Sequence, residues 1–232
     1  MKIGICAGHG GKDPGAVYGG LIEKNLNLKV ALKLKELLKL ADIDYFMVRE
    51  SDVFISLNDM TNILNKQKLD LIVDIHHNAG KGDGYDLFYS IYGNEGANFS
   101  KLLAVEFEKN GQNKHYIGVK KASDGRDYFY MIRGTVAPCI IGEYAFLDND
   151  RDNDIVDSEG DLINEARAYA KAICKFAGKA FVDFNTSEKN DSSNNSSDDL
   201  YFVQVGAFTN KDNATKLAND LKAKGFKSYI KK

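Results

Sequence analysis

Three short, nearly continuous apolar runs constrain the fold of this chain most. They are residues 2–7 (KIGICA), 69–76 (LDLIVDIH) and 137–146 (APCIIGEYAF). Runs of this length, rich in β-branched residues, are typical of buried strands in sheets that helices cover. Pro138 stands near the start of its run, where a strand tolerates proline. The runs therefore predict an α/β fold.

Segments with a helical spacing of apolar residues separate these strands. Helices are expected at residues 21–41, 57–64, 97–107 and 161–181, and further strands at 45–48 and 86–91. Strands that alternate with helices of this length form parallel sheets. We therefore expect residues 1–182 to form one domain, a mostly parallel twisted sheet with helices on both faces.

The C-terminal part of the chain has a different composition. Residues 183–199 (DFNTSEKNDSSNNSSDD) hold too few apolar side chains to bury, so a disordered linker is expected there. Residues 200–232 predict a small β-α-β unit, with a helix at 210–224 between strands at 200–206 and 226–230. Seven Lys and two Asp make this unit basic, which favours binding to an anionic surface.

The composition of the whole chain excludes several classes of protein. With 44% hydrophobic and 28% charged residues and a net charge of -2, it is typical of a globular protein. No apolar run is long enough for a membrane helix, and we expect neither membrane nor nucleic-acid partners. The first apolar run is too short for a secretory signal, so we expect synthesis in the cytoplasm without a signal peptide. The three cysteines lack the spacing of a metal cluster or a disulfide framework.

Four polar residues stand at the ends of the predicted elements. His9 follows the first strand, Glu23 lies near the start of the first helix, His76 ends the run 69–76, and Glu143 lies late in the last run. Carboxyl ends of strands meet at one edge of an open α/β sheet. Two imidazoles and one carboxylate are a usual catalytic zinc set, and a second carboxylate can transfer protons.

The residues alone leave alternatives open. A histidine in a glycine-rich loop, such as His9, can cap the backbone instead of binding a metal. Asp74 shares a strand face with His76 and competes with Glu23 as a ligand. His77 points to the opposite face, so at most one of the two adjacent histidines is expected to reach a metal.

Two further polar residues have different expectations. Glu143 lies in an apolar run, and an isolated buried carboxylate is costly without a charge partner or a function. His115 lies in the polar run Gly-Gln-Asn-Lys-His and is expected to be solvated.

Four strings carry a resemblance to a known family. GHGGKDPGA, EKNLNLKVALKLKELL, IHHNAG and PCIIGEYAFLDND stand in the right order over residues 1–178. They resemble the zinc-dependent N-acetylmuramoyl-L-alanine amidases of the Amidase_3 type. The resemblance implies an enzyme that hydrolyses the amide between the lactyl group of N-acetylmuramic acid and L-alanine in peptidoglycan.

The resemblance also implies a role for each site residue. It makes His9, Glu23 and His76 the ligands of Zn²⁺, and thereby prefers Glu23 to Asp74. Glu143 corresponds to the catalytic glutamate. Asn78, in the string IHHNAG, is the candidate for substrate binding.

The chain departs from the family pattern close to these residues. Cys6 and Ala7 stand where the family usually has Asp-Pro, and Asp74 where it usually has Ser. Ala145 replaces a Gly, and His77 replaces a commonly small residue. None of these changes removes a ligand, but all are expected to affect metal affinity or substrate fit.

Residues 200–232 resemble one repeat of a SPOR domain, a peptidoglycan-binding module, through VQVGAF, NA and KGF. A full domain pairs two repeats, so this half domain predicts a possible homodimer. The combination with an amidase and no signal resembles mother-cell lytic amidases of spore formers and, equally, phage endolysins. Such proteins act on the wall after lysis or holin-type release.

Three other functions remain as alternatives. A zinc carboxypeptidase or endopeptidase of the peptide stem would use nearly the same site. A non-catalytic wall-binding protein would carry it as a relic. A cysteine hydrolase built on Cys139 is disfavoured, because an apolar strand does not stabilise a thiolate.

Overall fold

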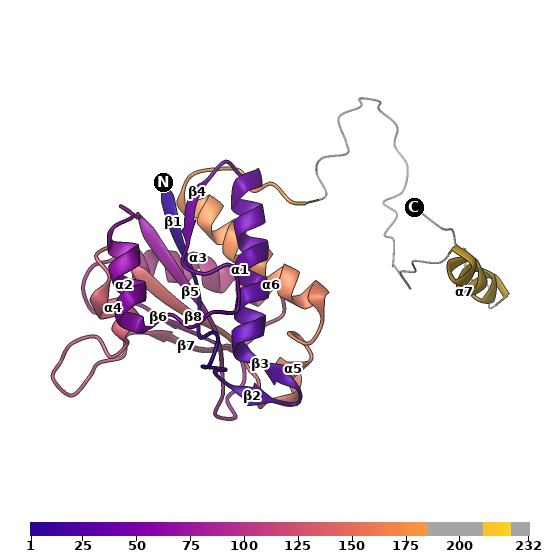
Figure 1. The fold of residues 1–232 in the computed structure, drawn as a ribbon, viewed down its shortest axis with the longest axis horizontal. Helices are drawn as coiled ribbons and strands as arrows, with labels where there is room; N and C mark the ends of the chain where they lie inside the picture. The colour runs from indigo at the N-terminus through magenta and orange to yellow at the C-terminus, as the bar shows by residue number, and fades with distance from the viewer. Residues whose placement is uncertain (185–210, 224–232) are drawn as a thin grey trace. The chain divides into compact units, whose positions relative to one another are not determined.

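A six-stranded sheet forms the centre of the N-terminal part of the chain (Figure 1). Its strands are β1 (Lys2–Ala7), β4 (Asp44–Met47), β5 (Leu71–Asn78), β6 (Tyr85–Phe88), β7 (Lys114–Gly118) and β8 (Cys139–Phe146). Their order in the sheet is β4-β1-β5-β8-β6-β7. Neighbouring strands are parallel throughout, except that β6 runs antiparallel to β8. The mostly parallel sheet predicted from the sequence is therefore confirmed.

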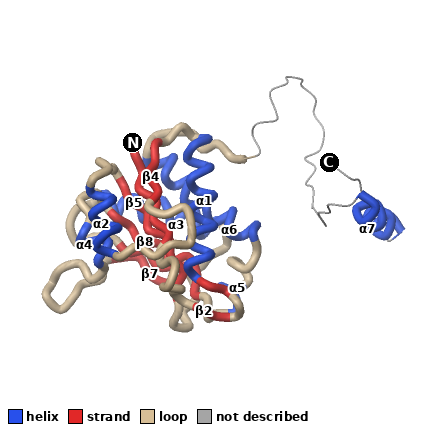
Figure 2. Tube along the Cα trace, in the orientation of Figure 1, coloured by secondary structure: helices blue, strands red, loops and turns tan. Residues whose placement is uncertain are grey.

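Helices cover both faces of this sheet, as predicted (Figure 2). One face packs against α1 (Glu23–Leu40), α3 (Glu95–Lys109) and α6 (Glu159–Phe176), and the other against α2 (Leu57–Asn65) and α4 (Tyr130–Gly134). Alternate residues of β1 face opposite layers, since Ile5 belongs to the core under α1 and Cys6 to the core under α2. Smaller elements are β2 (Val17–Tyr18), β3 (Leu21–Ile22) and α5 (Asp150–Asn153).

The computed structural model describes residues 1–184 and 211–223. The chain divides into two units, Met1–Glu188 and Lys189–Lys232, and this division falls within the predicted linker at 183–199. In the second unit α7 (Lys211–Ala223) lies where a helix was expected. The two strands predicted at 200–206 and 226–230, and the linker beyond residue 184, lie outside the described residues.

The sequence placed some boundaries wrongly. The last helix of the first unit begins at Glu159 rather than 161, because Ser158 and Asp161 form a capping box. It ends at Phe176 rather than 181, because Gly178 takes a left-handed conformation with φ 65°. The edge strand β7 was not predicted, since its exposed residues Lys114, His115 and Tyr116 carry no apolar alternation.

Among the described residues, no helix has the length and apolar character required to cross a membrane. Cys6, Cys139 and Cys174 are buried and form no disulfide.

Candidate metal and catalytic site

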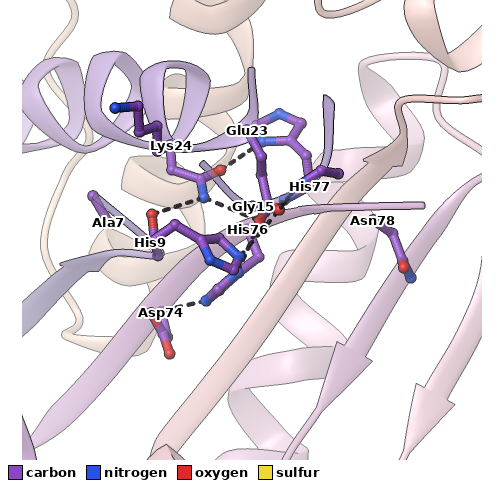
Figure 3. A network of polar contacts seen from close by, with 12 residues as sticks. Ala7, His9, Gly15, Glu23, Lys24, Asp74, His76, His77 and Asn78 are labelled. Atoms are coloured by element: carbon purple, nitrogen blue, oxygen red, sulfur yellow. Dashed lines mark hydrogen bonds and ion pairs between the residues drawn. The ribbon is translucent and has the colours of Figure 1, made fainter. Parts of the chain in front are cut away.

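Three predicted site residues come together where β1 and β5 end and α1 begins (Figure 3). His9 follows β1 in a left-handed conformation with φ 61°, Glu23 is the first residue of α1, and His76 lies in β5. A Cβ at Gly8 would collide with the His76 imidazole. The glycine before His9 therefore lets the loop approach β5 closely.

The Glu23 carboxylate lies between the two imidazoles. Its Oε1 is 2.9 Å from His76 Nδ1, and its Oε2 is 3.1 Å from His9 Nε2. One nitrogen or oxygen atom from each of the three residues lies within 4.8 Å of the others. Glu23 is only 3% exposed, and the backbone N–H groups of Ala16 and His77 also donate to it.

A carboxylate accompanies the remaining nitrogen of each imidazole. Asp13 Oδ2 is 2.9 Å from His9 Nδ1, and Asp74 Oδ1 is 3.5 Å from His76 Nε2. The sequence left Asp74 open as an alternative ligand to Glu23. In the structure Asp74 lies at the other nitrogen of His76 and outside the group of three. Asp13 thus orients the His9 ring toward Glu23, whereas Asp74 Oδ1 lies near His76 without a hydrogen-bond partner among the described residues.

The charges at the site favour a cation. Burial by itself raises the pKa of Glu23, but hydrogen bonds from His76 and His9 outweigh it and hold that pKa well below the usual range. Burial lowers the pKa of His76, yet Asp74 and Glu23 together bring it well above its usual value. Buried carboxylates thus make this corner of the molecule strongly negative, and positive charge is stabilised there.

Glu143 lies beside His76 on the neighbouring strand, since the two residues are register partners of β8 and β5. Its Oε2 is shielded from solvent and has no hydrogen-bond partner among the described residues. Burial raises the pKa of Glu143 to about 7; His76 opposes this rise and Glu23 adds to it. A carboxyl group with a pKa near the working pH is suited to proton transfer.

Asn78 does not join the group of three. It lies in β5 beyond a register shift that follows His76, and Figure 3 shows its side chain apart from the others. Its Nδ2 donates to Asp86 Oδ2 at 3.0 Å. The structure thus connects Asn78 with β6.

His77 points to the opposite face of the sheet and belongs to a buried network that sequence reasoning missed. Its Nδ1 lies 2.7 Å from Asn27 Oδ1, and its Nε2 lies 3.1 Å from Glu165 Oε2. Asn27 in turn donates to Glu23 Oε1 at 3.2 Å. Through Asn27, the network therefore helps to fix the position of the Glu23 carboxylate. The sequence does contain a signal for Glu165, because a charged residue among the apolar residues of one helix face indicates a buried polar partner.

Arg49 was also missed, because nothing in its surroundings in the sequence distinguishes it. Its Nε donates to Ala7 O at 2.9 Å, and its Nη2 donates to Gly8 O at 3.1 Å and Lys24 O at 2.9 Å. The guanidinium thereby ties the loop before His9 to the first turn of α1.

We expect His77→Ala to destabilise the fold by about 3–5 kcal/mol, because it leaves the buried Glu165 carboxylate without its charge partner. Both side chains have no exposed surface. Urea unfolding of His77→Ala, Glu165→Ala and the double variant would measure this coupling. The double variant should be more stable than the sum of the single effects predicts; simple additivity would contradict the pairing. Glu36→Ala, which breaks an exposed ion pair with Lys33, serves as control and should cost about 0–1 kcal/mol.

Comparisons with known proteins match both parts of the chain. Residues 3–175 match the family model described as N-acetylmuramoyl-L-alanine amidase, and residues 197–232 match the SPOR domain. The sporulation-specific N-acetylmuramoyl-L-alanine amidase of Bacillus subtilis is 33% identical over 99% of this chain and 84% of that protein.

Solved structures are similar to the N-terminal part. Cwp6 from Clostridium difficile superposes with a TM-score of 0.70 at 29% identity, over 75% of this chain and 29% of that one. The catalytic domain of CwlV, an N-acetylmuramoyl-L-alanine amidase from Bacillus (Paenibacillus) polymyxa, gives a TM-score of 0.67 at 25% identity, over 76% and 98%.

Proposed function

This chain belongs to the N-acetylmuramoyl-L-alanine amidase family, and we propose that it works with a zinc ion held by His9, Glu23 and His76 and with Glu143 as the proton-transferring group. As a member of that family it is an amidase that hydrolyses peptidoglycan. The observation that carries the metal proposal is the convergence of the three ligand atoms within 4.8 Å. Release of new L-alanine amino termini from cell walls, with the glycan chains intact, tests the bond that is cut.

The donor set fits zinc. Two imidazoles and one carboxylate are a usual set of protein ligands in catalytic zinc sites, and they leave one position for water or substrate. The donor atoms are close enough for one ion to contact all three residues, since Glu23 Oε1 lies 2.9 Å from His76 Nδ1 and Glu23 Oε2 lies 3.1 Å from His9 Nε2. Asp13 would hold the other ring nitrogen of His9, as carboxylates commonly do for zinc-bound histidines.

The metal ligands and Glu143 have different roles in the proposed reaction. When bound, zinc supplies polarisation of the amide carbonyl and activation of a water molecule. Glu143, one strand away from His76, takes a proton from the attacking water and gives it to the leaving nitrogen of L-alanine. No hydrogen bond within the described protein has to break before Glu143 Oε2 acts.

A cysteine mechanism is not supported by the surroundings of Cys139. This side chain is buried, and burial raises the pKa of its thiol well above the usual value. The thiol therefore stays protonated and is a poor nucleophile.

We expect Asp13→Ala to lower zinc affinity about 10–100-fold, because His9 loses the carboxylate that orients its ring. Competition with a chromophoric chelator would measure the affinity independently of activity. Asp124→Ala, which removes an exposed ion pair with Arg126, is the matched control. Equal affinity in both variants would show that Asp13 does not orient His9.

The second segment is proposed to hold the enzyme on its substrate. We assign residues 1–182 to the amidase, 183–199 to a linker and 200–232 to peptidoglycan binding, which the SPOR match supports. Its seven Lys residues would make this binding weaken as salt screens the charges. Pairing of two such segments in a homodimer stays a prediction, and sedimentation of the full chain tests it.

A further inference from the structure

Polar side chains lie next to one another on β5 and β8, where His76 and Glu143 are register partners. Further polar side chains follow on the next two strands of the sheet, β6 and β7. Asp86 of β6 and Glu143 of β8 are direct partners in the antiparallel pair, so their side chains lie on the same face of the sheet. Asp86 Oδ1 is 2.6 Å from His115 Nδ1, and Asp86 Oδ2 accepts from Asn78 Nδ2 at 3.0 Å. Three strands thus contribute to one cluster next to the proposed proton-transferring group.

We propose that Asn78, Asp86 and His115 form the subsite for the peptide part of the substrate, where His115 Nε2 accepts a hydrogen bond from a backbone N–H of that peptide. The proposal rests on the amidase function above, because that function supplies the peptide.

The exposure of the side chains distinguishes the residue that can contact a substrate from the residue that holds it in place. Asp86 is 5% exposed, whereas the His115 side chain is 48% exposed. A buried carboxylate is costly unless hydrogen bonds hold it, and here it receives one from each neighbour. Because Nδ1 carries the proton that is donated to Asp86, Nε2 on the other side of the ring is left as a hydrogen-bond acceptor, and no described residue hydrogen-bonds to it.

The backbone of β7 places His115 in this position. Tyr85 pairs with Lys114 and Asp86 pairs with Tyr116, so His115 is the extra residue of a bulge. A bulge redirects a side chain that regular alternation would turn to the other face. The ring also packs edge-on against Phe146, with 5.0 Å between the ring centroids. His115 is therefore solvent-exposed, as the sequence predicted, but Asp86 and Phe146 hold its ring in one orientation.

The strand order sets the direction of the substrate. Glu143 protonates the leaving nitrogen, and the chain that continues from this nitrogen is the peptide. His9, Glu23 and His76 lie on the β1–β5 side of Glu143, whereas β6 and β7 lie on the other side. Two strand spacings separate β7 from β8, about 10 Å, which about three extended residues span. The geometry therefore points to a contact near the third residue of the peptide.

Histidine ring signals in NMR spectra test the contact directly, since the chain has four histidines. In the zinc-loaded full chain, a stem tripeptide that begins with L-alanine should shift the His115 signals, which are identified by their absence in His115→Ala. N-acetylmuramic acid alone should leave them unchanged. His115 signals that do not respond to the tripeptide, or that respond equally to both compounds, would overturn the proposal.

Kinetics with N-acetylmuramoyl-tripeptide give a second readout. His115→Ala should raise KM about ten-fold with little change in kcat, because a ground-state hydrogen bond to the peptide is lost. His115→Gln supplies an amide oxygen as acceptor and should recover part of the loss. Lys101→Ala on the exposed side of α3 should match the wild type. A fall in kcat at constant KM would refute the peptide subsite.

The two proposals fail in different ways. A wild-type enzyme that releases no L-alanine amino termini from walls would contradict the amidase function itself. A wild-type enzyme that releases them, with an unchanged KM in His115→Ala, would contradict the subsite alone.

Discussion

Glu143→Gln should lower the rate of wall hydrolysis by about 10²–10⁴-fold while zinc content and wall binding stay at wild-type values. Glutamine has nearly the same size as glutamate but cannot accept the proton of the attacking water. Since Glu143 Oε2 has no hydrogen-bond partner among the described residues, the change should not disturb the fold. Appearance of new L-alanine amino termini measures the rate, and atomic absorption measures the metal.

Each other outcome of this substitution has a definite meaning. Hydrolysis at the wild-type rate would exclude Glu143 from the reaction. Loss of zinc together with loss of activity would make Glu143 a ligand instead of a proton-transferring group. Glu143→Ala should give the same loss of activity, and Glu36→Gln on the exposed side of α1 is the control for a loss of negative charge elsewhere. The expected result also separates an enzyme from a non-catalytic wall-binding protein.

Removal of the metal should abolish activity and lower the thermal stability, and added Zn²⁺ should restore both. An ion that binds only the folded state stabilises it by about 4 kcal/mol when its free concentration is 1,000 times Kd. The fold itself should survive chelation, because Glu23 can form a hydrogen bond with each of the two imidazoles. Metal analysis, thermal unfolding and wall hydrolysis before and after chelation measure the three effects.

The variant His76→Ala separates the metal site from a general effect of the chelator. Its melting temperature should no longer respond to Zn²⁺, whereas that of Lys101→Ala should respond like the wild type. Full activity in metal-free protein would refute the zinc proposal. Inactivation by an alkylating agent, with resistance to chelation, would favour the cysteine mechanism, which the buried position of Cys139 disfavours.

The sequence predicted the central elements of the fold because their apolar residues are buried. β1 has the predicted bounds, and α1 and β8 differ from the prediction by one or two residues at their ends. β7 escaped notice because an edge strand exposes most of its side chains and so needs no apolar pattern. The short helices α4 and α5 were missed because four or five residues are too few to show a helical period.

The candidate site could be predicted in part from the residues and in part from the family resemblance. Position at the end of a strand singled out His9 and His76, but the alternative ligand Asp74 was left open. The structure brings Glu23 between the two imidazoles and Asp74 to the far nitrogen of His76. Zinc binding by these residues stays a prediction that metal analysis tests.

The sequence by itself determined which side chains lie inside and which elements they form, because the period of an apolar pattern follows from the local geometry of a helix or strand. Only the tertiary structure decided which distant polar residues meet. The contact between His77 and Glu165 joins residues 88 positions apart, and that between Asp86 and His115 joins residues 29 positions apart. Such pairs depend on the order of strands and on a bulge in β7, and no local pattern of residues encodes either.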